Sequence, residues 1–197
     1  MEEKYVCLNG SYLKSDKPVL ESMNRSFLYG DGLFETIHAN GTEPQFIELH
    51  MNRILGSMKM LKMVIPGFFS EAYFTSHIKG VLTRNKQFQG ARVRITVFRN
   101  KGGLYTPDTN EVSFIIESSP LEHDLYTLNQ QGYKVDIFQE IAKPVNLLSS
   151  VKTTSALLFV LAGNFKTENQ LDECLLLNQF GRICESLSSN VFILKEK

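Results

Sequence analysis

The sequence predicts a mixed α/β protein in two parts. Apolar residues recur at helical spacing in two segments of the 197-residue chain, 48–62 and 71–85. Runs rich in β-branched and aromatic residues lie before and after these segments, as expected for strands. The run Ser118-Ser119-Pro120 then breaks the pattern. We therefore expect a domain boundary near residues 118–126.

The first part is expected to begin with a short hairpin over residues 5–13. This hairpin turns at Asn9-Gly10, because an Asn-Gly pair favours the positive φ angles that such turns need. A strand at 33–39 is followed by a second Asn-Gly pair, which predicts another hairpin.

Two helices and two strands complete the first part. Ser70 can cap the second helix, 71–85. The residues expected on the core face of that helix are Phe74, Ile78, Val81 and Leu82. The strands at 92–98 and 111–117 are joined by a long loop.

In the second part a strand begins at Tyr133 and a loop follows at Lys143-Pro144. We then expect a helix over 154–166 and two strands, 172–178 and 190–194. With one helix and a few strands, this part is small for a core of its own. Either a partner covers its open face or the chain is a fragment.

The composition argues against several classes of function. Twenty-one Lys and Arg residues balance twenty-one Asp and Glu residues, so neither nucleic acid nor an anionic membrane is an expected partner. Three cysteines without close pairing fit a reducing cytoplasm, and the four histidines lack ligand spacing, so we expect no metal site. The charged N-terminus is not typical of a signal peptide.

Two segments of the first part carry residues suited to chemistry. Gly30 and Gly32 flank Asp31 directly before a strand, but the full G-x-G-x-x-G pattern is absent, so a tight turn is the simpler interpretation. Arg53 lies off the apolar stripe of its helix, one turn after His50. It could present a guanidinium to a phosphate, or it could be an ordinary solvated arginine.

Two further segments lie in the second part. Lys152 stands at the junction of a loop and the expected helix, where the helix dipole disfavours a cation. Such local conflicts are more frequent at functional sites, although a surface lysine is the plainer alternative. The polar run 185–190 could surround a polar cofactor or be an ordinary turn.

Taken in order, these segments resemble the class IV aminotransferases. The matching motifs are Tyr-Gly-Asp-Gly-Leu-Phe-Glu at 29–35, His-x-x-Arg at 50–53, Lys-Thr at 152–153, and Glu-x-x-Ser-Ser-Asn-Val-Phe at 185–192. That family includes branched-chain and D-amino acid aminotransferases and 4-amino-4-deoxychorismate lyases. The resemblance runs from about Tyr5 to the end of the chain.

The resemblance implies pyridoxal 5'-phosphate (PLP) as cofactor. Lys152 matches the lysine that forms the Schiff base with PLP and later moves the substrate's α-proton. Glu185 matches the glutamate at the pyridine nitrogen, and Arg53 matches the arginine at the cofactor phosphate. The polar residues implied to surround the cofactor after Glu185 are Ser188, Ser189 and Asn190.

The resemblance also implies a substrate pocket formed by Tyr29, Phe34 and Arg94, with the tyrosine often reaching into the neighbouring subunit's site. The implied architecture is the two-domain fold of these PLP enzymes in a homodimer, with the cofactor between the domains. On this basis residues 1–120 form an N-terminal α+β domain. Residues 121–197 form the first part of a C-terminal α/β barrel-like domain.

The chain departs from the family in two ways. Leu157 stands five residues after Lys152, where branched-chain enzymes often have a tyrosine, and this favours the D-amino acid and lyase branches. Family members normally continue well past the Ser-Asn-Val-Phe strand. The resemblance therefore implies a truncated C-terminal domain, and we expect weak or absent PLP binding by these 197 residues alone.

We expect a cytoplasmic aminotransferase that moves an amino group from a primary amino acid, branched-chain-like or D-, to a 2-oxo acid. A 4-amino-4-deoxychorismate lyase that releases pyruvate and 4-aminobenzoate is the alternative. A non-catalytic binding module with the same fold is a second alternative.

Overall fold

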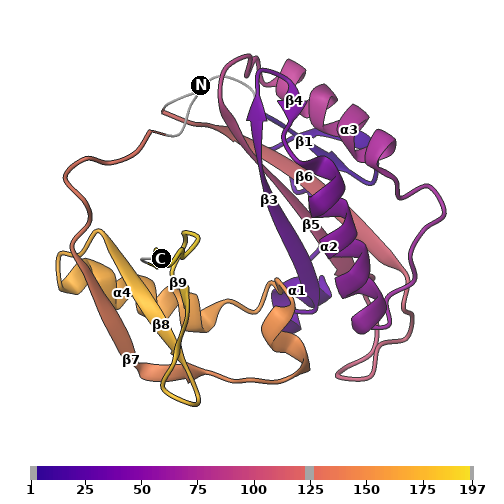
Figure 1. Ribbon diagram of the computed structural model, residues 1–197. Helices are drawn as coiled ribbons and strands as arrows, with labels where there is room; N and C mark the ends of the chain where they lie inside the picture. Colours follow the sequence, from indigo (N-terminus) through magenta and orange to yellow (C-terminus); the bar gives the residue numbers. More distant parts are fainter. Residues whose placement is uncertain (1–3, 123–126, 196–197) are drawn as a thin grey trace. The chain divides into compact units, whose positions relative to one another are not determined.

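The computed structural model of the chain describes residues 4–122 and 127–195 (Figure 1). These residues form two compact units. The first unit contains residues 4–122 together with the short segment 152–155, and the second contains 127–151 and 156–195. No pattern in the sequence indicates that 152–155 belongs with the first unit. The expected boundary region near residues 118–126 lies partly outside the described residues.

The first unit is built on a six-stranded antiparallel sheet with strand order β2-β1-β6-β5-β3-β4. The strands are β1 (Tyr5–Leu8), β2 (Ser11–Lys14), β3 (Gly32–Asn40), β4 (Glu43–Pro44), β5 (Ala91–Arg99) and β6 (Val112–Pro120). The β1–β2 hairpin turns at Asn9 and Gly10, which both have positive φ, as the Asn-Gly pair predicts.

In the described part of the first unit there are three helices: α1 (Arg25–Tyr29), α2 (Ile47–Met60) and α3 (Glu71–Arg84). α2 packs against β3 and α3 against β6 (Figure 1). The Ser70 side chain accepts a hydrogen bond from the Tyr73 amide and so caps α3, as expected. The four residues predicted for the core face of α3 are all completely buried.

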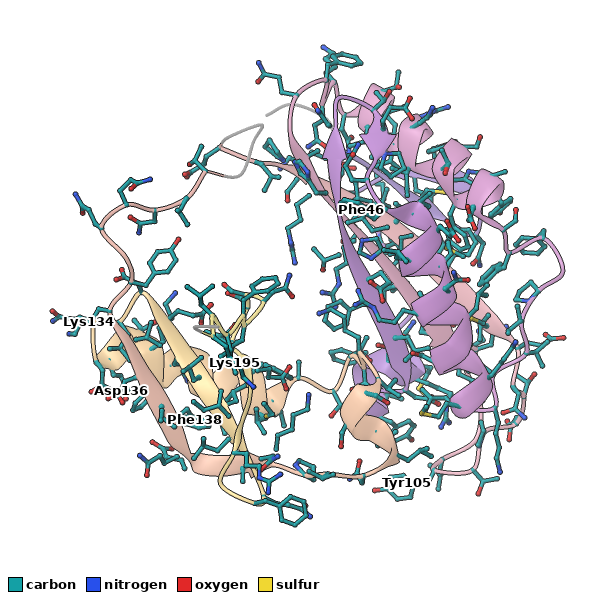
Figure 2. The ribbon with its side chains drawn as sticks, viewed as in Figure 1. Phe46, Tyr105, Lys134, Asp136, Phe138 and Lys195 are labelled. Atoms are coloured by element: carbon teal, nitrogen blue, oxygen red, sulfur yellow. The ribbon has the colours of Figure 1, made fainter. Side chains whose placement is uncertain are left out.

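The second unit contains a three-stranded sheet with strand order β7-β8-β9. Its elements are β7 (Val135–Lys143), the 3₁₀ helix η1 (Leu147–Ser150), α4 (Leu157–Glu168), β8 (Glu173–Asn178) and β9 (Ile183–Ser186). β7 and β8 are parallel, whereas β8 and β9 are antiparallel. Phe138 of β7, labelled in Figure 2, forms a small core with Ala162, Cys174 and Leu176.

The mixed α/β class is confirmed, but three local expectations are wrong. Residues 118–120 do not break the strand pattern, because β6 continues through Pro120 in register with β5. Proline is tolerated here because, within the described residues, β1 pairs with β6 only at Ile115 and Ile116, so the missing N–H of Pro120 leaves no bond between these strands unmade. The remaining two errors concern residues 152–157 and 190–194.

The fourth helix begins at Leu157 and not at residue 154. Lys152 is therefore not at a helix start, and the helix-dipole argument does not apply to it. The last strand is Ile183–Ser186, whereas residues 190–194 form no strand. The apolar run in 190–194 is largely exposed, and a strand exists only where a neighbouring strand receives its backbone hydrogen bonds. Among the described residues, no helix is long and apolar enough to cross a membrane.

Candidate functional site

Lys152 is held by backbone hydrogen bonds to the start of β3. The Phe34 amide donates to the Lys152 carbonyl at 2.9 Å, and the Thr154 amide donates to the Gly32 carbonyl at the same distance. The Ser26 hydroxyl donates to the Thr154 hydroxyl at 2.9 Å. These bonds fix the backbone of residues 152–154 and hence the point from which the Lys152 side chain extends.

Two glycines make this close approach possible. A Cβ added to Gly30 would lie 2.9 Å from Cβ of Ser155, and one added to Gly32 would lie 3.1 Å from Oγ1 of Thr154. Gly30 also has a φ of 67°, which side chains disfavour. The Gly-Asp-Gly run therefore leaves room for the segment that carries Lys152.

The ring of Phe34 lies close to two cations. Nζ of Lys152 is 4.9 Å from the ring centroid, and Cζ of Arg94 is 3.7 Å from it. Burial lowers the pKa of Arg94, the charge of Arg92 acts in the same direction, and Glu117 opposes both. The structure thus brings together three of the residues expected at the site: Lys152, Phe34 and Arg94.

Arg53 of α2 binds a buried carboxylate. Its Nε donates to Oε1 of Glu35 at 2.5 Å, and its Nη2 makes a short ion pair with Oε2. Nδ1 of His50 lies 2.7 Å from the same Oε2. Burial would raise the pKa of Glu35, but hydrogen bonds and charge from Arg53 and His50 outweigh it and hold this pKa below its ordinary value.

Glu35 and Phe34 are neighbours in β3 whose side chains point in opposite directions. Successive side chains of a strand point to opposite faces. In β3 the buried residues Leu33, Glu35 and Ile37 alternate with the less buried Phe34 and Thr36. Glu35 therefore lies on the face that α2 covers, whereas Phe34 lies on the other face.

In the second unit, Glu185 of β9 forms a short ion pair with Lys143 at the end of β7. Both side chains are partly buried and line a cavity of about 260 Å³. Burial and the charge of Glu185 raise the pKa of the neighbouring Cys184 thiol. The other lining residues are Pro144, Val145, Ser149, Asn178 and Cys184.

The serine-rich turn after β9 is anchored by Glu173. The hydroxyls of Ser188 and Ser189 each donate to Oε2 of Glu173 at 2.9 Å, and the Cys174 amide donates to Oε1 at 2.9 Å. Burial would raise the pKa of Glu173, but these hydrogen bonds lower it overall. Asn190, also expected at the cofactor, follows this turn and is exposed.

Tyr29 ends α1, and its ring centroid is 5.7 Å from that of Tyr105, which is 90% exposed on the loop before β6 (Figure 2). The guanidinium of Arg25 lies 4.9 Å from the Tyr29 ring. Buried Arg25 also donates to the Leu104 carbonyl at 2.6 Å and binds Asp31 at 2.8 Å. This network holds the loop, and hence both tyrosines, in place.

Lys152 and Glu185 belong to different units, so the expected pairing of these two residues around one cofactor stays a prediction. Sequence reasoning assigned no role to three acids or bases that contact expected site residues: Glu35, Lys143 and Glu173. A signal existed for Glu35, because it is an acid at a core-facing position of an alternating strand. No comparable pattern marks Lys143 or Glu173. Within the described residues no cluster of His, Cys, Asp and Glu could hold a metal ion.

The chain is similar to known proteins in sequence and in fold. The family model described as "Amino-transferase class IV" matches residues 32–197. A curated relative, the "Putative branched-chain-amino-acid aminotransferase" of Methanocaldococcus jannaschii, is 26% identical over 193 residues, covering 96% of this chain and 65% of the relative.

Solved structures share the fold. The branched-chain aminotransferase of Thermoproteus uzoniensis with norvaline has a TM-score of 0.78 at 19% identity, covering 94% of this chain and 63% of that one. The branched-chain amino acid aminotransferase from Escherichia coli has a TM-score of 0.77 at 20% identity, covering 94% and 62%. A structure titled "Putative 4-amino-4-deoxychorismate lyase" from Legionella pneumophila has a TM-score of 0.74 at 19% identity, covering 88% and 62%. The chain thus spans somewhat less than two thirds of the length of these relatives.

Proposed function

The chain belongs to the class IV aminotransferase family, and we propose that it carries the central residues of a PLP-dependent aminotransferase. The proposed reaction moves an amino group from a primary amino acid, branched-chain-like or D-, to a 2-oxo acid. The observation that carries this proposal is the fixed position of Lys152 beside Phe34 and Arg94. In this proposal the Lys152 amine lies next to an aromatic ring, and the cation on the same ring would bind a substrate carboxylate.

The donor set fits PLP chemically. The cofactor has an aldehyde, a pyridine nitrogen and a phosphate, and the chain offers an amine, a carboxylate and a guanidinium: Lys152, Glu185 and Arg53. The Glu185 carboxylate borders a cavity, as a group that receives a ring nitrogen must. When bound, PLP supplies a ring that withdraws electrons from the substrate's α-carbon.

Each residue has a defined task in this proposal. Lys152 would hold the cofactor through Nζ, and the same amine, once released by the incoming substrate amine, would move the substrate's α-proton. The negative charge of Glu185 favours a proton on the ring nitrogen. The Arg53 guanidinium binds the phosphate with both charge and orientation.

In this proposal the substrate is oriented on the face of the sheet that carries Phe34. The Arg94 guanidinium, stacked on Phe34, is placed to bind a substrate carboxylate. Tyr29 completes the pocket, and we propose a homodimer in which its exposed partner Tyr105 lies near the second subunit. The three cysteines are free thiols, which supports a reducing compartment and hence a cytoplasmic enzyme.

Borohydride reduction in the presence of PLP, followed by peptide mapping, tests the proposal. At saturating PLP, which allows for weak binding, we expect a phosphopyridoxyl group on Lys152 and none in Lys152→Ala. Lys143→Ala is the matched control, because it removes a lysine that lines the Glu185 cavity and should leave Lys152 labelled. Labelling of another lysine, or none at saturating PLP in the folded protein, would contradict the proposal and favour a non-catalytic binding module.

A lyase is the second candidate. It is favoured by Leu157, which stands where branched-chain enzymes often have tyrosine, and by the similarity to the Legionella pneumophila structure. Pyruvate release from aminodeoxychorismate without an amino acceptor would support the lyase. Turnover that requires 2-oxoglutarate would support the aminotransferase.

A further inference from the structure

The ion pair between Glu35 and Arg53 joins a buried carboxylate to a half-exposed guanidinium. The Glu35 side chain is 2% exposed, whereas the Arg53 side chain is 50% exposed. The buried carboxylate holds the guanidinium by Nε and Nη2. Within the described residues Nη1 of Arg53 has no hydrogen bond, so donors on the outer edge of the guanidinium stay available.

A two-point contact of this kind fixes the plane of the guanidinium. An exposed arginine otherwise samples many rotamers, and holding it in one of them carries an entropic cost. The bidentate fork removes this freedom before any ligand arrives. The geometry therefore gives Arg53 one orientation, set from inside the unit.

Glu35 also has the partners that a buried carboxylate needs. Burial of an unpaired charge is costly, so a carboxylate at this depth requires several hydrogen bonds. Arg53 supplies two and His50, one turn earlier in α2, supplies a third contact at 2.7 Å. The acid is thus stable in its ionised form and available as an anchor.

We propose that Glu35 is a positioning residue that aims Arg53 at the phosphate of the cofactor. This inference rests on the proposed function, in which Arg53 binds that phosphate. In this proposal Glu35 does not itself contact the phosphate. It acts by holding the inner edge of the guanidinium so that the outer edge meets the phosphate without reorganisation.

The test compares PLP with pyridoxal, which lacks the phosphate, in binding to the full protein followed by absorbance. We expect Glu35→Gln to weaken PLP binding about tenfold and pyridoxal binding less than about twofold. Arg53→Gln should show the same pattern with a larger loss. In the double variant Glu35→Gln/Arg53→Gln, PLP binding should be no weaker than in Arg53→Gln alone.

The control is Glu43→Gln, which breaks an exposed ion pair with Lys79 in the same unit and should change neither affinity. If Glu35→Gln weakens PLP and pyridoxal equally, or weakens neither, the positioning role is wrong. If Arg53→Gln leaves the ratio of the two affinities unchanged, the phosphate role of Arg53, and with it this inference, is wrong. Should Glu35→Gln fail to fold, His50→Gln retains the ion pair and should give a smaller loss confined to PLP.

Discussion

Nζ of Lys152 lies over the ring of Phe34, 4.9 Å from its centroid, and the Phe34 amide donates a 2.9 Å hydrogen bond to the Lys152 carbonyl. Backbone and side chain therefore both join these two residues. Because the Arg94 guanidinium stacks on the same ring at 3.7 Å, one aromatic side chain supports the proposed cofactor lysine and the proposed substrate-binding arginine.

Replacing Phe34 by leucine should impair substrate binding more than cofactor attachment. The backbone bond to Lys152 and the hydrogen bond from Arg94 to Thr96 stay, but Arg94 loses a cation–π contact of about 1–2 kcal/mol that helps to orient it. We expect kcat/KM to fall roughly 5- to 30-fold, while borohydride labelling of Lys152 stays near that of the unaltered protein. Phe34→Tyr retains the ring face and should be close to normal. Equal losses in both variants would show that the stacking has no role.

Gly32→Ala should disturb the site through the backbone. The added Cβ would lie 2.9 Å from Oγ of Ser26 and 3.1 Å from Oγ1 of Thr154, whose hydroxyls bond one another. Relief requires these side chains to shift, so we expect a loss of about 1–3 kcal/mol in the free energy of unfolding. Labelling of Lys152 by PLP and borohydride should fall as well. Denaturant unfolding and peptide mapping measure the two effects.

Gly56→Ala provides the matched control. Nothing lies within 4 Å of a Cβ added at this position of α2. Alanine is a better helix former than glycine, so the free energy of unfolding of this variant should rise by up to about 1 kcal/mol. If Gly32→Ala is as well tolerated as Gly56→Ala, the close approach of the Lys152 segment to β3 does not depend on glycine.

Local signals predicted much of the first unit. α3 was predictable because Ser70 and its four core residues lie within one short stretch, where spacing alone determines the buried face. Both Asn-Gly turns are equally local. The pairing of residues 152–154 with β3 joins segments distant in sequence, and no periodicity reports such a contact.

The same distinction applies to the site. The order of the four motifs identified the candidate residues, but their partners Glu173 and Lys143 are matched to them only by folding. At 190–194, by contrast, a local signal predicted a strand that does not form. The apolar residues of this run favour a strand, yet strand formation depends on a neighbour that the run itself cannot specify.

Glu173→Gln should destabilise the second unit in a pH-dependent way. The pKa of Glu173 in the folded protein lies below its ordinary value of 4.5, because hydrogen bonds favour the ionised form despite burial. Its contribution is therefore fully present above about pH 4.5 and is lost as the pH falls through the lowered pKa. At pH 7 we expect Glu173→Gln to lower the free energy of unfolding by about 1.5–3 kcal/mol, which is typical of hydrogen bonds to a charged group.

Urea unfolding of both proteins between pH 3 and pH 7 measures this effect. The difference between Glu173→Gln and the unaltered protein should narrow below about pH 4.5. Glu140→Gln, at an exposed position of β7, is the control. Its free energy of unfolding should stay within about 0.5 kcal/mol of that of the unaltered protein at every pH. A difference that stays constant across the pH range would mean that the ionised form of Glu173 is not what anchors the serine turn.

Arg94→Gln and Arg92→Gln should separate specific recognition from general attraction. Both arginines lie on one face of β5, but Arg94 is half-buried on Phe34, whereas Arg92 is exposed. Loss of a charged hydrogen bond to a substrate carboxylate costs about 1.5–3 kcal/mol, so Arg94→Gln should reduce kcat/KM roughly 10- to 100-fold, mainly through KM. Arg92→Gln should lower kcat/KM less than about threefold, because solvent screens the charge of Arg92. This loss of kcat/KM should vanish at high salt. Equal losses that both disappear with salt would mean that the strand attracts anions without a defined carboxylate site.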